Sequence, residues 1–574
     1  MKNRIHIFIV LLSLIFAGCK TTPKEIKTEE VKQPVKPVNP AITEAEKLLK
    51  KGSYESIIEA VKKLKDENLL KDPKGAEIAY LSREIYKLIY PELKSKFPPI
   101  DTIEYSGTYR RYFGIVGKAI PLEASTDYFN LMLPGMVMAG KHQSKIDKSY
   151  LEELKKSLVS AIDINPDAPI PYYLLALTEE ALKNTDNEIN NLKKSIKTDR
   201  NFYPAEIRLA QLYINGKGKN KNFIEGSKLL EIAASIIPPN ADVQKMLAEA
   251  YYSLKEYGKA EASSANALLL KPKREDLVLL RAKILKASGK WQQALRMYNL
   301  ALKFAPEQRD ALLAKGEIIF YNENNLTGSL DILNSGEKAY PKDPSFPELK
   351  GRILLEAGKD NEGLKELNNA LELQPGRIST LRMLLQNSIS MKRWIQGAIY
   401  LSQILEQSSS EEDLKLAYTV FKNLGDTGQA LTYAEKLYKL GTDEEYTGFY
   451  IEQLYTSGKM KEALKLITEN LPKIRSRFVK SDLYLYKAKI IEKSDKNEAL
   501  TALRKAIMLY PDNLKAIIKI SQLYSNLHMY RRAGLYLKHA VQLDPNNPGL
   551  KIQLKQVMDL YSGAFDQGMK QLNY

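Results

Sequence analysis

Apolar side chains recur every three or four positions along most of the chain, and short breaks separate these stretches. Residues 241–272, ADVQKMLAEAYYSLKEYGKAEASSANALLLKP, show the pattern twice, once on each side of a break that contains Gly258. Apolar positions at this spacing are typical of amphipathic helices, and glycine favours a turn between them. The pattern therefore predicts an all-α protein built from helical hairpins.

A fixed period organises these hairpins. Prolines recur at intervals of 34 or 35 residues, namely Pro272, Pro306, Pro341 and Pro375, and later Pro511 and Pro545. Small residues stand five positions before them: Ala267, Ala301, Gly336, Ala370, Ala506 and Ala540. Proline ends a helix, and a small residue lets a neighbouring helix approach closely. A period of this size indicates a stacked array of repeats.

A second position, which is mostly small, lies twelve residues before each of these prolines and can be followed beyond them. Its members are Leu154, Glu188, Gly226, Ala260, Ala294, Ser329, Gly363, Gly397, Ala430, Ala463, Ala499 and Ala533. Their spacings stay between 33 and 38 residues, and the loop NGKGKNKN from Asn215 accounts for the longest. This ladder predicts the second helix of each hairpin.

The repeat that ends at Pro272 resembles the tetratricopeptide repeat family. The positions that carry the resemblance are Leu247, Ala248, Tyr251, Ala260 and Ala267. The resemblance implies a right-handed α-solenoid of tetratricopeptide-like helical hairpins, with about twelve repeats over 127–545. The outer repeats and those over 377–480 follow the pattern less closely. We expect Trp291 in a hairpin turn, which is not the position where the family usually has tryptophan.

The two ends of the array differ from the repeats. Residues 546–574 predict a C-terminal capping helix and tail, because an array needs a helix over its last apolar face. Residues 41–126 predict an irregular helical N-terminal cap that starts with two amphipathic helices. Prolines, glycines and aromatic residues interrupt this cap, so we expect a non-helical insert over 97–126. Such an insert is either functional or a loop folded over the cap.

The first residues are typical of an exported protein. An apolar run over 7–16, too short to span a bilayer, follows two basic residues and leads into Ala17, Gly18 and Cys19. This junction resembles the bacterial lipobox, although Phe16 stands where leucine is usual. The resemblance implies that Cys19, the only cysteine in the chain, is the site of lipidation by acyl chains such as palmitate.

Two segments follow from this interpretation. Residues 1–18 are expected to be a lipoprotein signal peptide. Residues 19–40 are charged and rich in proline, so they predict a disordered tether that holds the body away from a membrane. The expected location is the bacterial cell envelope, periplasmic or surface-exposed, with the protein anchored to a membrane through its lipid.

Composition and charge limit the classes of function. With 27% charged and 44% hydrophobic residues, the chain is neither fibrous nor wholly disordered. The net charge of +17 is uneven: residues 201–300 hold 16 basic and 9 acidic residues, and 501–574 hold 10 and 4. Nucleic acid attracts such a surface, but an exported lipoprotein meets little of it. Anionic lipid headgroups, cell-wall polymers or acidic protein segments are the expected counterparts, unless the charges are merely solvated.

The sequence offers little for catalysis. Beyond the predicted signal the histidines are His142, His528 and His539, too few and too scattered to favour metal or nucleophilic chemistry. Residues 135–142 match the spacing of a phosphate loop, but His142 replaces the Ser or Thr and no strand is expected before them. We therefore predict no enzyme, no metal site and no cofactor.

Ligands of tetratricopeptide proteins usually lie along the first helices, which line a concave groove. By that resemblance the candidates for a ligand groove are Lys245, Glu249, Lys283, Lys286 and Arg352. They do not repeat the set of Lys, Asn and Arg by which some family members clamp a C-terminal carboxylate.

These expectations predict a membrane-anchored tetratricopeptide repeat lipoprotein that acts as a non-catalytic protein-protein interaction scaffold or assembly factor at the bacterial cell envelope. A protein or peptide is the expected partner in the groove, and nucleic acid is not. The alternative is a surface-exposed adhesin that binds host or matrix components, because the same tether and basic surface would serve it. Protease treatment of intact cells separates the two.

Overall fold

The computed structural model describes residues 39–100, 105–113, 122, 125–141, 146–216 and 221–572. Every regular element within these ranges is a helix, which confirms the predicted all-α class. The protein forms two compact units that divide after Ser288. The predicted signal peptide, with Cys19 after it, and most of the predicted tether lie outside the described residues.

The first unit contains the helices up to α13. They are α1 (Pro40–Lys51), α2 (Tyr54–Asp66), η1 (Leu69–Lys71), α3 (Pro73–Ile89), η2 (Pro91–Lys96), α4 (Thr108–Phe113), α5 (Tyr128–Lys141), α6 (Lys148–Ile164), α7 (Pro169–Ala181), α8 (Thr185–Thr198), α9 (Tyr203–Asn215), α10 (Phe223–Ile236), α11 (Ala241–Ser253), α12 (Tyr257–Leu270) and α13 (Glu275–Ala287).

The second unit contains the remaining helices. They are α14 (Trp291–Phe304), α15 (Arg309–Glu323), α16 (Leu326–Ala339), α17 (Ser345–Glu356), α18 (Asp360–Leu373), α19 (Ile378–Ser390), α20 (Trp394–Leu405), α21 (Glu411–Leu424), α22 (Thr427–Leu440), α23 (Glu445–Thr456), α24 (Met460–Asn470), α25 (Arg477–Ile491), α26 (Lys496–Leu509), α27 (Leu514–Asn526), α28 (Tyr530–Leu543) and α29 (Pro548–Leu572).

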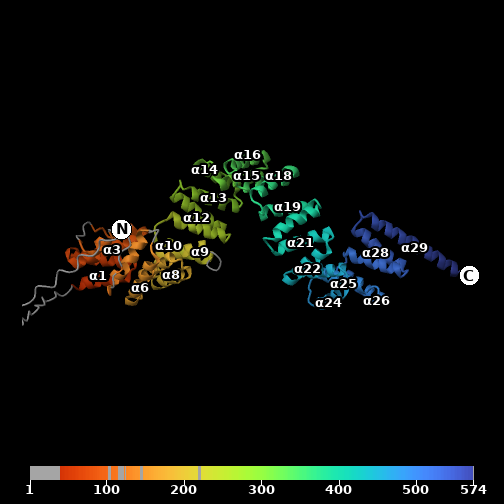
Figure 1. Ribbon diagram of the computed structural model, residues 1–574, viewed down its shortest axis with the longest axis horizontal. Coiled ribbons are helices and arrows are strands. Elements are labelled where there is room, and N and C mark those ends of the chain that lie inside the picture. The colour runs from red at the N-terminus through yellow and green to blue at the C-terminus, as the bar shows by residue number, and fades with distance from the viewer. Residues whose placement is uncertain are drawn as a thin grey trace, which may run out of the picture. The chain divides into compact units, whose positions relative to one another are not determined.

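Within each unit the helices pack in consecutive pairs (Figure 1). The pairs run from α5 with α6 to α11 with α12 in the first unit, and from α15 with α16 to α27 with α28 in the second. We call the earlier member of each pair its first helix and the later member its second helix. Each second helix also packs against the next first helix, so that α12 contacts α13 and α26 contacts α27. The structure thus confirms the predicted stack of helical hairpins.

The turn inside a hairpin explains why glycine recurs along the chain. Gly358 and Gly458 occupy these turns with φ of +75° and +77°. Only glycine adopts this left-handed conformation without a steric cost from Cβ. Lysine takes the same position in two other turns, where Lys255 and Lys392 have φ of +61° and +56°. One residue in a left-handed conformation therefore closes each of these hairpins.

The predicted ladder on the second helices is buried at every position. The buried residues are Leu154, Glu188, Gly226, Ala260, Ala294, Ser329, Gly363, Gly397, Ala430, Ala463, Ala499 and Ala533. At α17 and α18 the reason is direct: a Cβ added to Gly363 would lie 3.0 Å from the carbonyl oxygen of Gly351. The ladder marks the line along which paired helices meet.

Gly336 shows where the sequence pattern and the packing disagree. Other repeats carry alanine at this position, and alanine is the better helix former. A methyl group on Gly336 would, however, lie 2.6 Å from Cζ and 2.7 Å from Cδ1 of Phe346. The Phe346 ring is fully buried and stacks on Tyr340 with centroids 6.0 Å apart, so it has no room to move.

We therefore expect Gly336→Ala to lower the free energy of unfolding by about 1–3 kcal/mol through overpacking. Urea unfolding of the full chain, with hydrogen exchange to localise the loss to α16 and α17, measures the effect. Gly448→Ala on α23 is the matched control, because nothing lies within 4 Å of the added methyl group. That change should be neutral or stabilising by up to ~1 kcal/mol. Equal effects of the two changes would refute the packing explanation.

The N-terminal cap begins with α1, α2 and α3, where two amphipathic helices were expected. Helix α1 starts at Pro40 and is capped by Asn39, so its first residue is the last of the predicted tether. That boundary is corrected by one residue, because proline at the first helical position is favourable. The Tyr90 hydroxyl donates to the carbonyl of Gly52 at 2.6 Å, and Asn165 donates to Lys50 at 2.7 Å. The first bond is buried within the cap, and the second, which is partly buried, ties the cap to the first repeats.

The predicted non-helical insert is wrong over Thr108–Phe113, which forms α4. Tyr105, Tyr109 and Phe113 are four residues apart and so share one side of the segment. Tyr80 of α3 lies against the first and last of them, with ring centroids 5.1 and 6.3 Å away. The sequence analysis interpreted these aromatic residues as helix breakers and overlooked their helical spacing. The described part of the insert packs onto the cap.

Three further segments can be located in the structure. Trp291 is the first residue of α14, so its predicted place in the turn is corrected by one position. Helix α29 covers Pro548–Leu572, where the capping helix was expected, and packs against α28. Residues 135–141 lie inside α5, so the glycines with phosphate-loop spacing belong to a helix. Within the described ranges, no helix has the length and apolar character needed to cross a membrane.

Candidate functional site

Polar side chains on successive first helices contact each other about one repeat apart. In the second unit these hydrogen bonds join residues separated by 31 to 35 positions. They are Arg352 to Glu317 (3.1 Å), Tyr321 to Glu356 (2.7 Å), Arg382 to Asp413 (2.8 Å), Tyr418 to Glu452 (2.9 Å), Tyr446 to Glu411 (2.6 Å) and Asn513 to Asp482 (2.9 Å).

We call the side chains that project from α15, α17, α19, α21, α23, α25 and α27 in this row the first-helix face of the second unit. The spacing of these hydrogen bonds along the chain is close to the period of the sequence repeat. Because each side chain is held by the next repeat, the polar groups of this face are fixed before any partner arrives. Fixed groups bind with a smaller loss of conformational entropy than mobile ones.

In the first unit, three of the predicted groove residues lie together. The Lys245 ammonium on α11 lies 2.9 Å from Asp276 of α13 and 3.8 Å from Glu249. Burial raises the pKa of Glu249, and the positive charges of Lys245 and Lys283 oppose that rise. Hydrogen bonds from Arg274 and Lys245 hold the pKa of Asp276 well below its usual value. Lys245 is therefore already paired within the protein.

The other two predicted residues lie elsewhere. Lys286 is one turn beyond Lys283 on α13. Arg352 belongs to α17 of the second unit, where it donates to Glu317 at 3.1 Å and lies over the Tyr321 ring at 5.8 Å. Their assignment to a ligand groove stays a prediction.

Glu452 on α23 is a well-connected group of the first-helix face. Its Oε2 atom accepts from Lys422 at 2.6 Å and from the Tyr418 hydroxyl at 2.9 Å, both on α21. Burial alone would raise its pKa, but Lys422 and Tyr418 lower it below the usual value. On α25, burial and the nearby negative charge of Glu452 raise the pKa of Tyr486. The Glu452 carboxylate thus joins α21 to α23 and lies near α25.

Neither Glu452 nor Asp413 was among the predicted groove residues, although the period of the sequence relates both to their partners. Glu452 lies 34 residues after Tyr418, and Asp413 lies 31 after Arg382. Comparing each polar side chain of a first helix with the acidic residues one period away locates both pairs.

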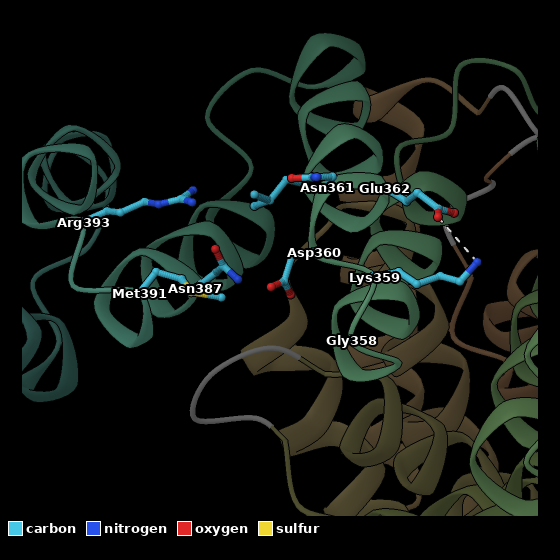
Figure 2. Close-up of a pocket in the computed structure, with 9 residues that line it drawn as sticks. Gly358, Lys359, Asp360, Asn361, Glu362, Asn387, Met391 and Arg393 are labelled. Carbon is cyan, nitrogen blue, oxygen red and sulfur yellow. Dashed lines mark ion pairs between the residues drawn. The ribbon is translucent and has the colours of Figure 1, made fainter.

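A polar pocket of about 370 Å³ lies at the edge of the second unit, where two hairpin turns meet (Figure 2). The turn between α17 and α18 contributes Asp360, and the end of α19 with the turn after it contributes Asn387 and Arg393. Figure 2 shows these three side chains around one opening, while Lys359 and Glu362 pair with each other at 3.4 Å. The described residues hold no group of three or more potential metal ligands, here or elsewhere. The pocket is a polar notch in which one carboxylate, Asp360, faces an amide and a guanidinium.

Two of the three histidines considered in the sequence lie in the described part of the chain, one before α28 and one on it. His528 is exposed in the turn before α28 and bonds to the Tyr530 hydroxyl at 2.8 Å, while His539 is partly buried on α28. His142 lies outside the described residues.

Family comparison identifies the repeats. The family model of the tetratricopeptide repeat matches residues 279–344 and again 514–547, the latter over α27 and α28. These two segments are tetratricopeptide repeats. Proteins of this family are generally non-catalytic scaffolds for protein interaction, in which each repeat adds to an extended binding surface.

Curated relatives resemble this chain over part of their length. The DnaJ homolog subfamily C member 7 homolog of Schizosaccharomyces pombe is 21% identical over 300 residues, which are 47% of this chain and 62% of the relative. The protein CTR9 homolog of Arabidopsis thaliana is 21% identical over 298 residues, 48% of this chain and 26% of the relative. The chain spans less than two thirds of either relative.

Among solved structures, the chain is similar to PilW, a widely conserved type IV pilus biogenesis factor. The two share 22% identity, with 36% of this chain and 96% of PilW covered and a TM-score of 0.31.

Proposed function

We propose that the protein is a membrane-anchored lipoprotein that acts as a protein-protein interaction scaffold or assembly factor at a bacterial cell envelope. The observation that carries the scaffold is the first-helix face, where a series of polar groups is held in place by hydrogen bonds between neighbouring repeats. A surface fixed in this way suits a protein or peptide partner. The fixed groups include no nucleophile paired with a base, so the proposal contains no reaction.

The anchor rests on the first residues of the sequence. A basic start, a short apolar run and Ala17-Gly18-Cys19 support lipidation of Cys19 after removal of residues 1–18. Two acyl chains hold a protein at a membrane far more firmly than one. With a tether over 19–39, the helical units would stand away from the bilayer and present their first helices to partners.

Replacing Cys19 tests the anchor. We expect the wild-type protein, produced in a bacterium, to incorporate an alkyne analogue of palmitate and to fractionate with membranes. Cys19→Ser should abolish the labelling and move the protein out of the membrane fraction, while Thr21→Ser should change neither. Labelling that persists in Cys19→Ser, or membrane association without any labelling, would overturn the anchor.

Crosslinking in intact cells tests the scaffold. Reproducible crosslinks from one envelope protein to residues of the first helices would support it. If the bait is abundant and captures no cell protein, the scaffold is refuted. Loss of the protein after protease treatment of intact cells would favour the alternative, a surface adhesin.

A further inference from the structure

The end of the first-helix face holds a group of lysines and tyrosines with an unusual balance of charge. On α21, α23, α25 and α27 the group contains four lysines, three carboxylates and three tyrosines. They are Lys422, Lys489, Lys515 and Lys519; Glu452, Asp482 and Glu492; and Tyr418, Tyr455 and Tyr486. We call this set the lysine–tyrosine cluster.

Each carboxylate of the cluster already has a partner. Glu452 accepts from Lys422 at 2.6 Å, and Glu492 lies 2.5 Å from the Lys519 ammonium. Asp482 accepts from the side-chain amide of Asn513 at 2.9 Å. Two of the four lysines are therefore paired with carboxylates, and the third carboxylate is occupied by a neutral donor.

The other two lysines, Lys489 and Lys515, form no ion pair with any residue that the structure describes. Lys489 is half-buried on α25, with its ammonium 4.7 Å from the Tyr486 ring and 5.5 Å from the Tyr455 ring. Lys515 is exposed on α27, the first helix that packs against α25. Two unpaired cations thus lie on neighbouring first helices.

The surroundings of Lys489 disfavour its charge. Burial lowers the pKa of Lys489, and the positive charges of Lys515 and Lys519 lower it further. The negative charges of Glu452 and Asp482 oppose this only in part, and a cation over the two tyrosine rings gains less than one in a direct ion pair. A carboxylate placed between Lys489 and Lys515 would relieve both the burial and the repulsion.

We propose that Lys489 and Lys515 bind a side-chain carboxylate of an acidic peptide segment in a partner protein. The proposal deepens the scaffold function proposed above and rests on it. Tyr455, whose ring lies beside Lys489, provides an apolar surface for a neighbouring residue of the same segment. The bound carboxylate would supply the negative charge that the four first helices lack.

Binding of a defined peptide tests this site. The probe is fluorescein-labelled hexaglutamate with an amidated C-terminus, and hexaglutamine is its uncharged counterpart. By fluorescence anisotropy at physiological salt, we expect hexaglutamate alone to bind the full chain. Lys489→Gln with Lys515→Gln should weaken binding by roughly tenfold or more, since removing a buried or partly buried charge partner costs several kcal/mol.

A matched control separates the site from general attraction to a basic protein. Lys461→Gln with Lys538→Gln removes the same charge from exposed positions of the second helices α24 and α28. This control should change the affinity less than about twofold, because exposed charges are screened at this salt. Circular dichroism checks that both double variants remain folded, and Lys515→Glu alone, at an exposed position, should also abolish binding.

Three results would overturn the site: no binding of hexaglutamate to the wild type, equal loss in the two double variants, or unchanged binding in the Lys489 and Lys515 variant. Crosslinking tests the proposed scaffold function independently of the peptide-binding experiment. If a captured cell protein is retained by Lys489→Gln with Lys515→Gln, the scaffold stands and the lysine site is wrong. If no cell protein is captured by the wild type, the scaffold fails whatever the peptide result.

Discussion

Raising the pH from 5.5 to 8.5 should destabilise the first unit by about 3 kcal/mol, because Glu206 is buried without a partner. Glu206 lies in the first turn of α9 and is fully buried, and neither of its oxygens has a hydrogen-bond partner in the structure. Burial raises the pKa of Glu206 to about 8, and the negative charge of nearby Asp199 adds to that rise. The carboxyl group is therefore neutral in the folded protein near pH 7.

The sign of the pH dependence follows from the two pKa values of Glu206. In the unfolded chain its pKa is 4.5, so between 4.5 and about 8 the unfolded state loses a proton that the folded state keeps. The stabilising contribution is complete below pH 4.5 and is lost as the pH rises toward 8. Each pH unit in this window costs about 1.4 kcal/mol. Asp199, whose pKa burial also raises, contributes in the same direction.

Glu206→Gln tests this explanation, since glutamine resembles the neutral acid but cannot ionise. We expect the stability of the variant relative to the wild type to rise by about 3 kcal/mol between pH 5.5 and pH 8.5. Urea unfolding at each pH measures the free energy of unfolding. Hydrogen exchange, corrected for the pH dependence of the intrinsic exchange rate, localises the change to α9. Glu153→Gln at an exposed position of α6 is the control and should follow the wild type. An unchanged pH slope in Glu206→Gln would refute the assignment.

The repeat architecture could be predicted because one physical requirement is repeated many times. A small residue is needed wherever paired helices meet, so the ladder from Leu154 to Ala533 locates the second helices from the order of residues alone. The exceptions come from single tertiary contacts that carry no period. Gly336 is glycine because of Phe346, and α4 forms because Tyr105 and Phe113 meet Tyr80 of α3.

The candidate site could be predicted only in part, for a related reason. Because the first helices could be located from the sequence, Lys245 and Arg352 were predicted as cations available to a ligand. In the structure both are held by acidic residues, Asp276 and Glu317. Lys489 was not chosen, because its lack of a carboxylate partner depends on how Glu452 and Asp482 are used by other side chains. Which charge is left unpaired is decided by packing.

Removing the Arg382 side chain should cost about 3 kcal/mol at pH 7, because it leaves a buried charge behind. Asp413 on α21 is fully buried, and Arg382 of α19 donates to both of its carboxylate oxygens, at 2.9 and 2.8 Å. The hydroxyl of Ser410 donates to Asp413 at 2.6 Å. The serine bond survives the substitution, and Arg382 is itself 38% exposed. We therefore expect a loss of stability at the low end of the range for breaking a buried ion pair.

The cost should disappear in acid. Burial alone would raise the pKa of Asp413, but the bonds from Arg382, Ser408 and Ser410 hold it below 3.8. The pair therefore stabilises the fold above that value and loses its contribution as the pH falls through the lowered pKa. Arg382→Met, which keeps an apolar stem, should be much less stable than the wild type at pH 7, and this difference should shrink as the pH is lowered toward 3. Urea unfolding at both values, followed by the fluorescence of Trp291 and Trp394 in the same unit, measures the difference.

An exposed ion pair provides the comparison for this prediction. Lys439 and Glu435 of α22 form a pair at 2.7 Å with side chains 70% and 41% exposed. Lys439→Met should leave the free energy of unfolding almost unchanged at either pH, because water screens the pair. If both variants behave alike, the contacts between successive first helices add little stability. If only Arg382→Met is destabilised, these contacts hold neighbouring repeats in register, and the same rigidity positions Lys489 and Lys515 for a partner.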